Sequence, residues 1–183
     1  MKKTIFLLLL LATSLFAKGR IYTGIGYSLY NEDYTDKSME DVSLTDNALK
    51  FKIGYGVRKA YAVEFSLDYI DHSDYNTMPA IGSAKYAFSI ALLKAFDFNT
   101  FFNPYLKVGF GAGIIDNLGK PEKSLTYGSF DLGGGVFIPL SYTYDIELAY
   151  EYKNATYQKE NLDSALNNTS NINIFYIGIN TRF

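Results

Sequence analysis

Apolar and polar residues alternate along most of the chain. In segment 61–70, for example, Tyr61, Val63 and Phe65 share one face, and polar residues such as Glu64 and Asp68 fall on the other. A period of two places successive side chains on opposite faces of a β-strand. The pattern predicts eight strands, each near the roughly 9–11 residues of a tilted transmembrane strand. They span approximately residues 20–30, 47–57, 61–70, 83–96, 104–114, 127–138, 142–152 and 172–183.

The connections between these strands alternate in length. Three are short, at residues 58–60, 97–103 and 139–141, and four are long and polar. The long ones are residues 31–46, 71–82, 115–126 and 153–171. An even number of antiparallel strands, with long loops on one side and short turns on the other, is typical of an outer-membrane barrel. The sequence therefore predicts an all-β fold, an eight-stranded antiparallel up-and-down transmembrane β-barrel.

The alternation does not by itself decide which face points outward. A soluble lipocalin-like barrel would turn its apolar face inward, around a ligand. Here the polar faces carry repeated glycines, such as Gly24 and Gly26, which suit a crowded interior. Tyrosines gather near the strand ends of the apolar face, with aliphatic residues and Phe between them. This arrangement favours an apolar band facing lipid between two aromatic girdles.

The first residues are typical of a secretory signal peptide. Lys2 and Lys3 precede an unbroken apolar run from Ile5 to Leu11, and Ala17 offers a small residue for cleavage. The alternative is an uncleaved anchor, but the run is shorter than the roughly 20 residues of a spanning helix. We therefore expect a signal peptide at residues 1–17 and one barrel domain at 18–183. The chain has no cysteine, which excludes a lipidated amino-terminal Cys and any disulfide.

Composition narrows the class of partner. The formal net charge of −2 becomes more negative when Lys2 and Lys3 are removed, so we expect no nucleic-acid partner. The chain contains 17 Tyr and 14 Phe but no Trp. Such aromatic content suits strands and membrane interfaces.

Several motifs resemble those of a known family. Pro104-Tyr105 followed by Gly109, Gly111 and Gly113 is similar to a strand of the small opacity-type barrels, as are the segments 133–135 and 147–152. The final strand, which ends on Phe183, resembles the terminal strand of outer-membrane barrels, although Thr181 stands where the family more often has an aromatic residue. The resemblance extends to the membrane domain of OmpA and to OmpX.

The resemblance implies a location in the outer membrane, with both termini of the chain in the periplasm and the long loops facing the cell exterior. It implies contact with outer-membrane lipid and lipopolysaccharide, and recognition of Phe183 by the barrel-assembly machinery. Members of this group do different jobs, so the fold transfers better than the function.

The predicted inward faces carry charges of both signs. These are Arg20, Lys50, Lys52, Lys85, Lys107 and Arg182, with Glu64, Asp68, Asp131, Asp145, Glu147 and Glu151. An eight-stranded barrel is just wide enough to be filled by side chains, and charges there must pair. They form either a salt-bridge plug or a narrow polar path.

Strand register predicts which of these charges meet. We expect Asp68 to lie among Lys50, Lys52 and Lys85, as the centre of an ion cluster in the outer half of the barrel. At the other end of the barrel, we expect Arg182 to meet Asp145 or Glu147.

The remaining candidates for chemistry are isolated. His72 is the single histidine, and its neighbours Ser73 and Asp74 would usually point away from it, so no nucleophile–base–orienter set is formed. The first long loop is acidic, but its spacing does not match a calcium loop. Its acidic residues are Glu32, Asp33, Asp36, Glu40, Asp41 and Asp46. We therefore expect a solvated loop, no metal, no cofactor and no enzymatic activity.

These observations lead to three functional hypotheses. The first is a monomeric outer-membrane protein with a structural or adhesive role, which binds a host or extracellular ligand through its four loops. The alternative is a narrow channel for ions or small solutes, and the third is a lipid A-modifying enzyme.

Overall fold

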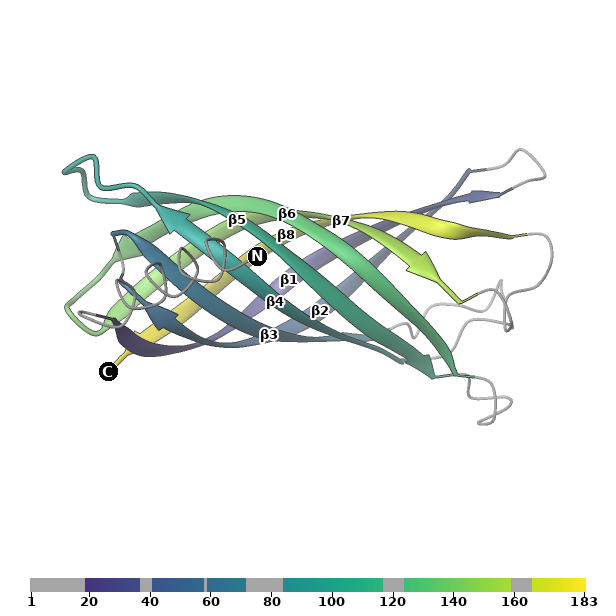
Figure 1. Cartoon of the computed structure of the whole chain (residues 1–183), viewed down its shortest axis with the longest axis horizontal. Helices are drawn as coiled ribbons and strands as arrows, with labels where there is room; N and C mark the ends of the chain where they lie inside the picture. The colour runs from purple at the N-terminus through teal and green to yellow at the C-terminus, as the bar shows by residue number, and fades with distance from the viewer. Residues whose placement is uncertain (1–18, 37–40, 58, 72–83, 117–123, 159–165) are drawn as a thin grey trace, which may run out of the picture.

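The strands close into a single barrel (Figure 1). The computed structural model describes residues 19–36, 41–57, 59–71, 84–116, 124–158 and 166–183. Within these residues, eight antiparallel strands follow one another around the barrel in chain order. In this part of the chain there is no helix that is long and apolar enough to cross a membrane. The predicted fold class is confirmed.

The strands differ in length. They are β1 (Arg20–Asp36), β2 (Asp41–Gly56), β3 (Tyr61–Asp71), β4 (Ala84–Ala95), β5 (Asn103–Asp116), β6 (Leu125–Pro139), β7 (Tyr144–Tyr157) and β8 (Leu166–Arg182). The barrel closes where β8 pairs with β1, so that Tyr22 lies opposite Arg182 and Ile25 opposite Ile179. Every strand therefore has two neighbours, which satisfies the backbone N–H and C=O groups inside a bilayer.

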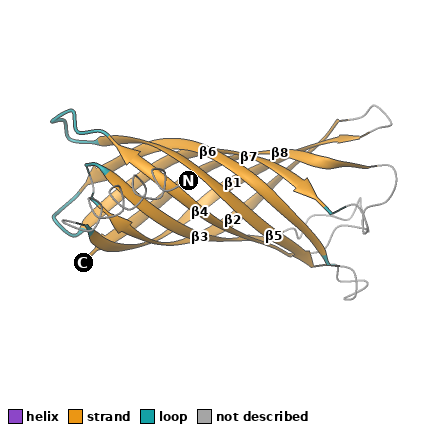
Figure 2. Ribbon diagram, in the orientation of Figure 1, coloured by secondary structure: helices purple, strands orange, loops and turns teal. Residues whose placement is uncertain are grey.

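The short connections lie together at one end, called the turn end below; the opposite end is called the loop end (Figure 2). Tight backbone hydrogen bonds close the turns, for example from Phe96 N to Pro104 O at 2.8 Å. Lys59 Nζ lies 2.9 Å from Asp97 Oδ2 and joins two neighbouring turns. The hydrogen bond from Lys59, with a second from the Asn99 backbone N–H, lowers the pKa of the Asp97 carboxyl.

Four strands extend about five or six residues further toward the loop end than the sequence predicts. β1 continues to Asp36 and β2 begins at Asp41, so the expected long loop over residues 31–46 is wrong in its bounds. β7 and β8 likewise take up both ends of the expected loop at 153–171. Beyond the apolar band the outward residues turn polar, as at Asn31 and Thr45. The apolar–polar alternation therefore fades although the strand continues.

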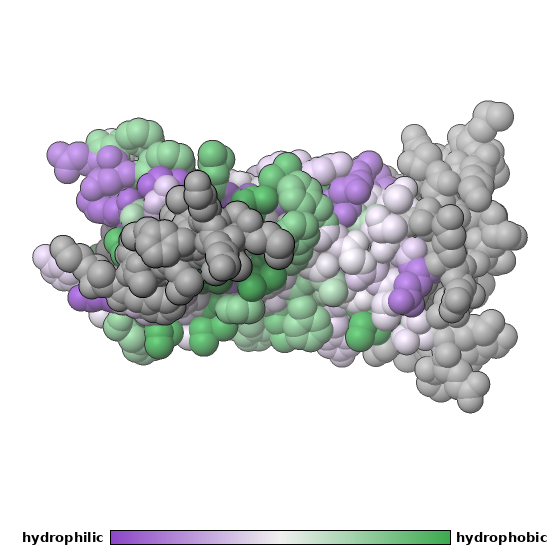
Figure 3. Space-filling model, viewed as in Figure 1, coloured by the Kyte–Doolittle hydropathy of each residue, from purple (hydrophilic) through white to green (hydrophobic). Residues whose placement is uncertain are grey.

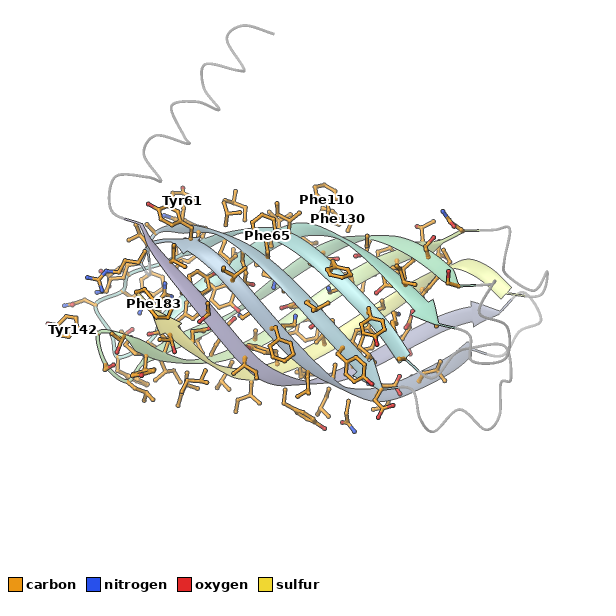
Figure 4. All side chains as sticks on the ribbon, turned by 90° about the horizontal axis from the view of Figure 1, so that it is seen from below. Tyr61, Phe65, Phe110, Phe130, Tyr142 and Phe183 are labelled. Atoms are coloured by element: carbon orange, nitrogen blue, oxygen red, sulfur yellow. The ribbon has the colours of Figure 1, made fainter. Side chains whose placement is uncertain are left out.

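The apolar faces of the strands point outward. Side chains such as Ile25 and Phe65 are about half exposed, at 48% and 53%, and Phe110 reaches 65%. On the face seen in Figure 3, apolar residues gather over part of the barrel wall between its two ends. In Figure 4, Phe65, Phe110 and Phe130 project away from the barrel. The lipid-facing interpretation of the apolar face is thus confirmed over the lipocalin-like one.

The apolar–polar alternation of β4 is broken at Leu93 and Lys94, and the break has a local cause. Leu93, on the otherwise polar face, is buried in an inward apolar cluster with Ala62 and Phe137. Lys94, on the outward face, places its Nζ 4.0 Å from the centre of the Tyr61 ring, a cation–π geometry. Neighbouring residues at the turn end therefore stabilise both side chains, Leu93 by apolar packing and Lys94 by the cation–π contact.

Inward glycines make room for large side chains. Gly26 on β1 and Gly178 on β8 lie opposite each other. A Cβ atom at either position would collide with Tyr176, whose side chain lies across both glycines. Gly54 has the same relation to the ring of Tyr22. The glycines therefore allow bulky aromatic residues inside a narrow barrel.

Candidate functional site

Charged side chains fill the lumen. Among the described residues, six cationic and eight anionic side chains are buried inside the barrel. They are Lys50, Lys52, Lys85, Lys107, Lys153 and Arg182, with Glu32, Asp46, Glu64, Asp68, Asp131, Asp145, Glu147 and Glu151. Desolvating so many charges is costly, so the geometry of their pairing decides whether the barrel is stable.

The central layer of the lumen is built around Glu151 of β7. Lys50 Nζ lies 2.9 Å from both carboxylate oxygens of Glu151. Lys107 donates to the same carboxylate at 2.6 Å and lies 3.3 Å from Glu64. Lys52 lies 3.3 Å from Glu64 and also pairs with Glu147. Three lysines and three glutamates from four strands (β2, β3, β5 and β7) thus form one connected network.

Asp68 lies at the loop-ward side of this network. The register places it opposite Lys50, and its carboxylate is 3.5 Å from Lys50 Nζ. Lys153 approaches Asp68 at 3.7 Å, and also lies 3.3 Å from Asp131 and 2.8 Å from Ser89 Oγ. Asp68 therefore sits between two lysines that also have other, closer partners.

The predicted cluster is brought together only in part. Lys50 lies beside Asp68, but Lys85 pairs with Glu32 and Lys52 with the two glutamates Glu64 and Glu147. The centre of the network is thus Glu151 and not Asp68. Because the sheet closes into a barrel, the side chains of β7 and β2 meet inside the lumen. Adjacent-strand register could not give this contact.

A second layer closes the loop end of the lumen. Lys85 Nζ lies 2.6 Å from Glu32, which also accepts hydrogen bonds from the Ser170 and Tyr157 hydroxyls. Three tyrosine rings surround the Lys85 ammonium group. Its distances to the ring centres are 4.5 Å for Tyr127, 5.1 Å for Tyr30 and 5.6 Å for Tyr157. Apolar residues such as Ile70 and Ile172 pack against this layer.

A third layer closes the turn end. Arg182 Nε donates to Asp145 Oδ2 at 2.6 Å, while Glu147 turns toward Lys52 instead. The rings of Tyr105 and Phe137 stack beside this pair, with centroids 4.5 Å apart. A cavity of about 10 Å³ remains there, lined in part by Tyr22 and Arg182. This is about the space that one water molecule occupies.

Three buried lumen charges, Glu32, Asp46 and Lys153, lie in segments that the sequence predicts to be loops. The strands that carry them extend beyond the apolar band. The interpretation of residues 31–46 as a solvated acidic loop is wrong for Glu32 and Asp46, which are buried inside the barrel. Arg20, expected inside, is exposed at the turn end of β1. The signal in the sequence that could have indicated the longer strands is the period-two spacing of inward residues, which continues beyond the apolar band.

The remaining predicted positions do not form a site in the described residues. Phe183 is 70% exposed at the turn end (Figure 4), and its backbone N donates to Ile21 O at 2.9 Å. His72, with the segments 72–83, 117–123 and 159–165, lies outside the described residues. Within the described residues, no group of three or more histidine, aspartate or glutamate side chains is arranged to hold a metal ion.

The closed eight-stranded barrel, its outward apolar face and its charged lumen define an outer-membrane type of β-barrel. The outer membrane protein beta-barrel domain family model matches residues 4–183. The chain belongs to this family, and its location is accordingly the outer membrane. No curated protein matches the sequence significantly.

Solved structures of small outer-membrane barrels share the fold. Neisserial surface protein A superposes with a TM-score of 0.69 at 14% identity, over 89% of this chain and 97% of that one. The attachment invasion locus protein Ail of Yersinia pestis gives 0.56 at 17% identity, over 91% and 99%. The N-terminal barrel domain of Pseudomonas aeruginosa OprF gives 0.56 at 11% identity, over 91% and 100%. At these identities the likeness concerns the fold alone.

Proposed function

We propose that this protein is a monomeric outer-membrane barrel with a sealed lumen, which binds an extracellular or host ligand through the segments at its loop end. The observation that carries this proposal is the filling of the lumen at three levels. The Lys85–Glu32 layer, the network around Glu151 and the Arg182–Asp145 layer place paired charges at both ends and in the middle of the lumen. With the lumen filled in this way, the barrel can meet a large ligand only through its outer surface.

The loop end is the favoured binding surface. Three of its four connections, at residues 72–83, 117–124 and 158–165, are longer than the turns at the opposite end. In this proposal the loop end faces the cell exterior, and both termini of the chain are periplasmic. A barrel of the same fold, Ail of Yersinia pestis, has been solved in complex with the heparin analogue sucrose octasulfate. That complex supports the idea that a barrel of this size can take an extracellular ligand.

Replacement of single loops tests the binding role. Residues 72–83, 117–123 or 159–165 would each be exchanged for a Gly-Ser segment of equal length, and heat-dependent gel mobility would show that the barrel has folded. We expect bacteria carrying one or more of these variants to adhere less to host cells and to immobilised extracellular-matrix components. The matched control replaces residues 97–102 at the turn end and should leave adhesion unchanged. Equal adhesion by all loop variants would contradict the proposal.

A narrow channel is the second candidate, because charged side chains run along the whole lumen. The tight pairing argues against conduction, since an ion would have to displace buried salt bridges that cost several kcal/mol to break. We expect refolded protein in planar bilayers to show no stepwise conductance at neutral pH. Regular single-channel steps from the wild-type protein would favour the channel instead.

We infer no enzymatic role. The single histidine has no second histidine to act with, and catalysis would need a base and an orienting group within hydrogen-bond reach. We expect the mass spectrum of lipid A to stay unchanged when the protein is expressed in a host that lacks it. A lost or added acyl chain would point to the third hypothesis.

A further inference from the structure

Strand β2 reaches further at the loop end than one of its two neighbours. β1 pairs with β2 along its whole length, up to Thr35 opposite Asp41. On the other side, β3 ends at Asp71, opposite Asn47. Among the described residues, no strand lies against this side of residues 41–45, which are called the free edge below. Figure 1 shows the paired ends of β1 and β2 projecting at the loop end. Five strand residues span about 17 Å, enough to pair with a short extended segment.

The free edge is held in an extended shape before any partner arrives. Its register with β1 runs without a bulge, and the Thr45 hydroxyl donates to the side-chain oxygen of Asn31 on β1. Leu44 packs against the apolar cluster at the loop end of the lumen. A strand that is already ordered loses less conformational entropy on binding than a flexible loop does. The backbone of the free edge is therefore preorganised for pairing.

The free edge also lacks features that commonly protect an exposed strand. Lysine, proline and β-bulges blunt many natural edges, and residues 41–45, Asp-Val-Ser-Leu-Thr, contain no lysine or proline. In an antiparallel sheet, alternate residues direct their N–H and C=O groups to opposite neighbours. About two or three residues of the free edge therefore present both groups away from β1. Such a row is a template for another extended chain.

Charge limits what kind of chain can pair there. Asp33 on β1 lies opposite Ser43, and Asp71 ends β3 next to the free edge. Both aspartates are exposed on the outward face. Ser43 is short and neighbouring strands lie about 4.8 Å apart, so a lysine or arginine on an added strand can reach across Ser43 toward Asp33. A second copy of this barrel would bring the same aspartates to the edge, and facing like charges destabilise a strand pair. A basic segment therefore fits better than a second copy.

We propose that the free edge of β2 captures an extended, lysine- or arginine-rich segment of another protein by β-strand addition. Main-chain hydrogen bonds to residues 41–45 hold the segment, and Asp33 and Asp71 select its charge. The inference rests on the proposed function, because it needs the loop end to face the cell exterior. It narrows the ligand to a basic peptide and places the contact on a strand instead of the longer loops.

Two peptides with the same side chains test strand addition. The first is an acetylated, amidated peptide of four Lys-Thr repeats, and the second is the same peptide with every backbone nitrogen methylated. The methylated peptide keeps the charge but has no N–H to donate to a neighbouring strand. Each would be titrated onto the protein in nanodiscs of phosphatidylcholine, which carries no net charge. Hydrogen exchange of residues 41–45 would be followed by mass spectrometry, with and without peptide.

Two pairs of lysine substitutions locate the contact. Ser43→Lys/Thr45→Lys places two positive charges on the free edge. Asn154→Lys/Thr156→Lys is the matched control on β7. Asn154 and Thr156 are also exposed, outward and two residues apart near the loop end, but β7 is paired there on both sides. Heat-dependent gel mobility would show that each barrel has folded.

We expect the wild-type protein and the β7 variant to bind the Lys-Thr peptide, and residues 41–45 to become protected from exchange when it binds. Methylation of the peptide, or the β2 substitutions, should each weaken binding about tenfold. Equal binding of the two peptides, or binding of neither, would overturn the proposal. Equal affinities in the β2 and β7 variants would do the same. Complete protection of residues 41–45 before peptide is added would show that this chain or a second copy already covers the edge. Neither adhesion nor the longer loops enter the measurement, so failure of the proposed function would not imitate these results.

Discussion

A single carboxylate, Glu151, connects most of the lumen. It accepts hydrogen bonds from Lys50 and Lys107, whose side chains come from opposite parts of the barrel wall. Replacing it by Gln would leave two buried ammonium groups without their closest anion. Glu151→Gln should lower the free energy of unfolding by about 3–5 kcal/mol, the usual cost of breaking a buried ion pair. Urea titration of the barrel refolded in lipid vesicles measures this.

Asp68 provides the comparison for Glu151. It lies 3.5 Å and 3.7 Å from its two lysines, and each lysine has a closer partner. Asp68→Ala should therefore destabilise the barrel less than Glu151→Gln, and neutralising Lys50 as well should recover part of the loss. A larger effect at Asp68 than at Glu151 would mean that the network is centred where strand register alone predicts it.

Close packing of Tyr176 against glycine gives a second residue-scale prediction. A methyl group at Gly178 would collide with the Tyr176 hydroxyl, so Gly178→Ala should cost about 1–3 kcal/mol, as overpacking usually does. In a Tyr176→Ala background the same change should cost clearly less. Part of the cost should remain, because the Ile25 carbonyl oxygen also lies close to Gly178. A double-mutant cycle measures the difference, and strictly additive effects would exclude the contact as the cause.

Phe183 distinguishes assembly from stability. Its side chain is largely exposed, so it contributes little to packing. Deleting Phe183, or replacing it by Ser, should reduce the amount of folded barrel in cells far more than it reduces refolding in detergent. The expected reason is recognition by the barrel-assembly machinery. Similar losses in cells and in detergent would show that Phe183 acts through packing alone.

At the scale of elements, orientation can be read with single cysteines, because the chain has none of its own. Lys120→Cys lies in a connection at the loop end and Thr100→Cys in a turn at the opposite end. A membrane-impermeant maleimide added to intact cells should label Lys120→Cys only, whereas both should react after lysis. Labelling of Thr100→Cys on intact cells would show that the turn end faces the cell exterior. The loop end could then not be the extracellular binding surface.

Strands were predictable where the membrane imposes a period. Between the two aromatic girdles most outward residues are apolar, so the direction of a side chain such as Ile25 or Phe65 can be predicted from sequence alone. Beyond the band, the outward Asn31 and the inward Glu32 are both polar, and the strand becomes indistinguishable from a loop. Contacts across the lumen, such as Lys50 with Glu151, depend on the curvature of the closed sheet and not on neighbouring register. The direction of the side chains in the barrel wall was therefore easier to predict from sequence than the ion pairs across the lumen.

At the scale of the molecule, the two surfaces of the wall have separate tasks. The inward surface holds the barrel together through paired charge and aromatic packing, and the outward surface meets lipid. The loop-end connections belong to neither. Substitutions in these connections should therefore change the stability of the barrel very little. The connections can then change the ligand that they bind without unfolding the protein.

The pairing of β1 with β8 also has a kinetic consequence. These strands stand at opposite ends of the chain order, yet each is the other's neighbour in the closed sheet. Until they meet, the growing sheet has two open edges whose N–H and C=O groups can pair with any other extended chain. Contacts this distant in sequence also form slowly, because the chain must first pay the entropy of closure. This protein is therefore most prone to aggregation before its barrel closes. The time that it spends unclosed determines how much chaperone assistance it needs on its way to the membrane.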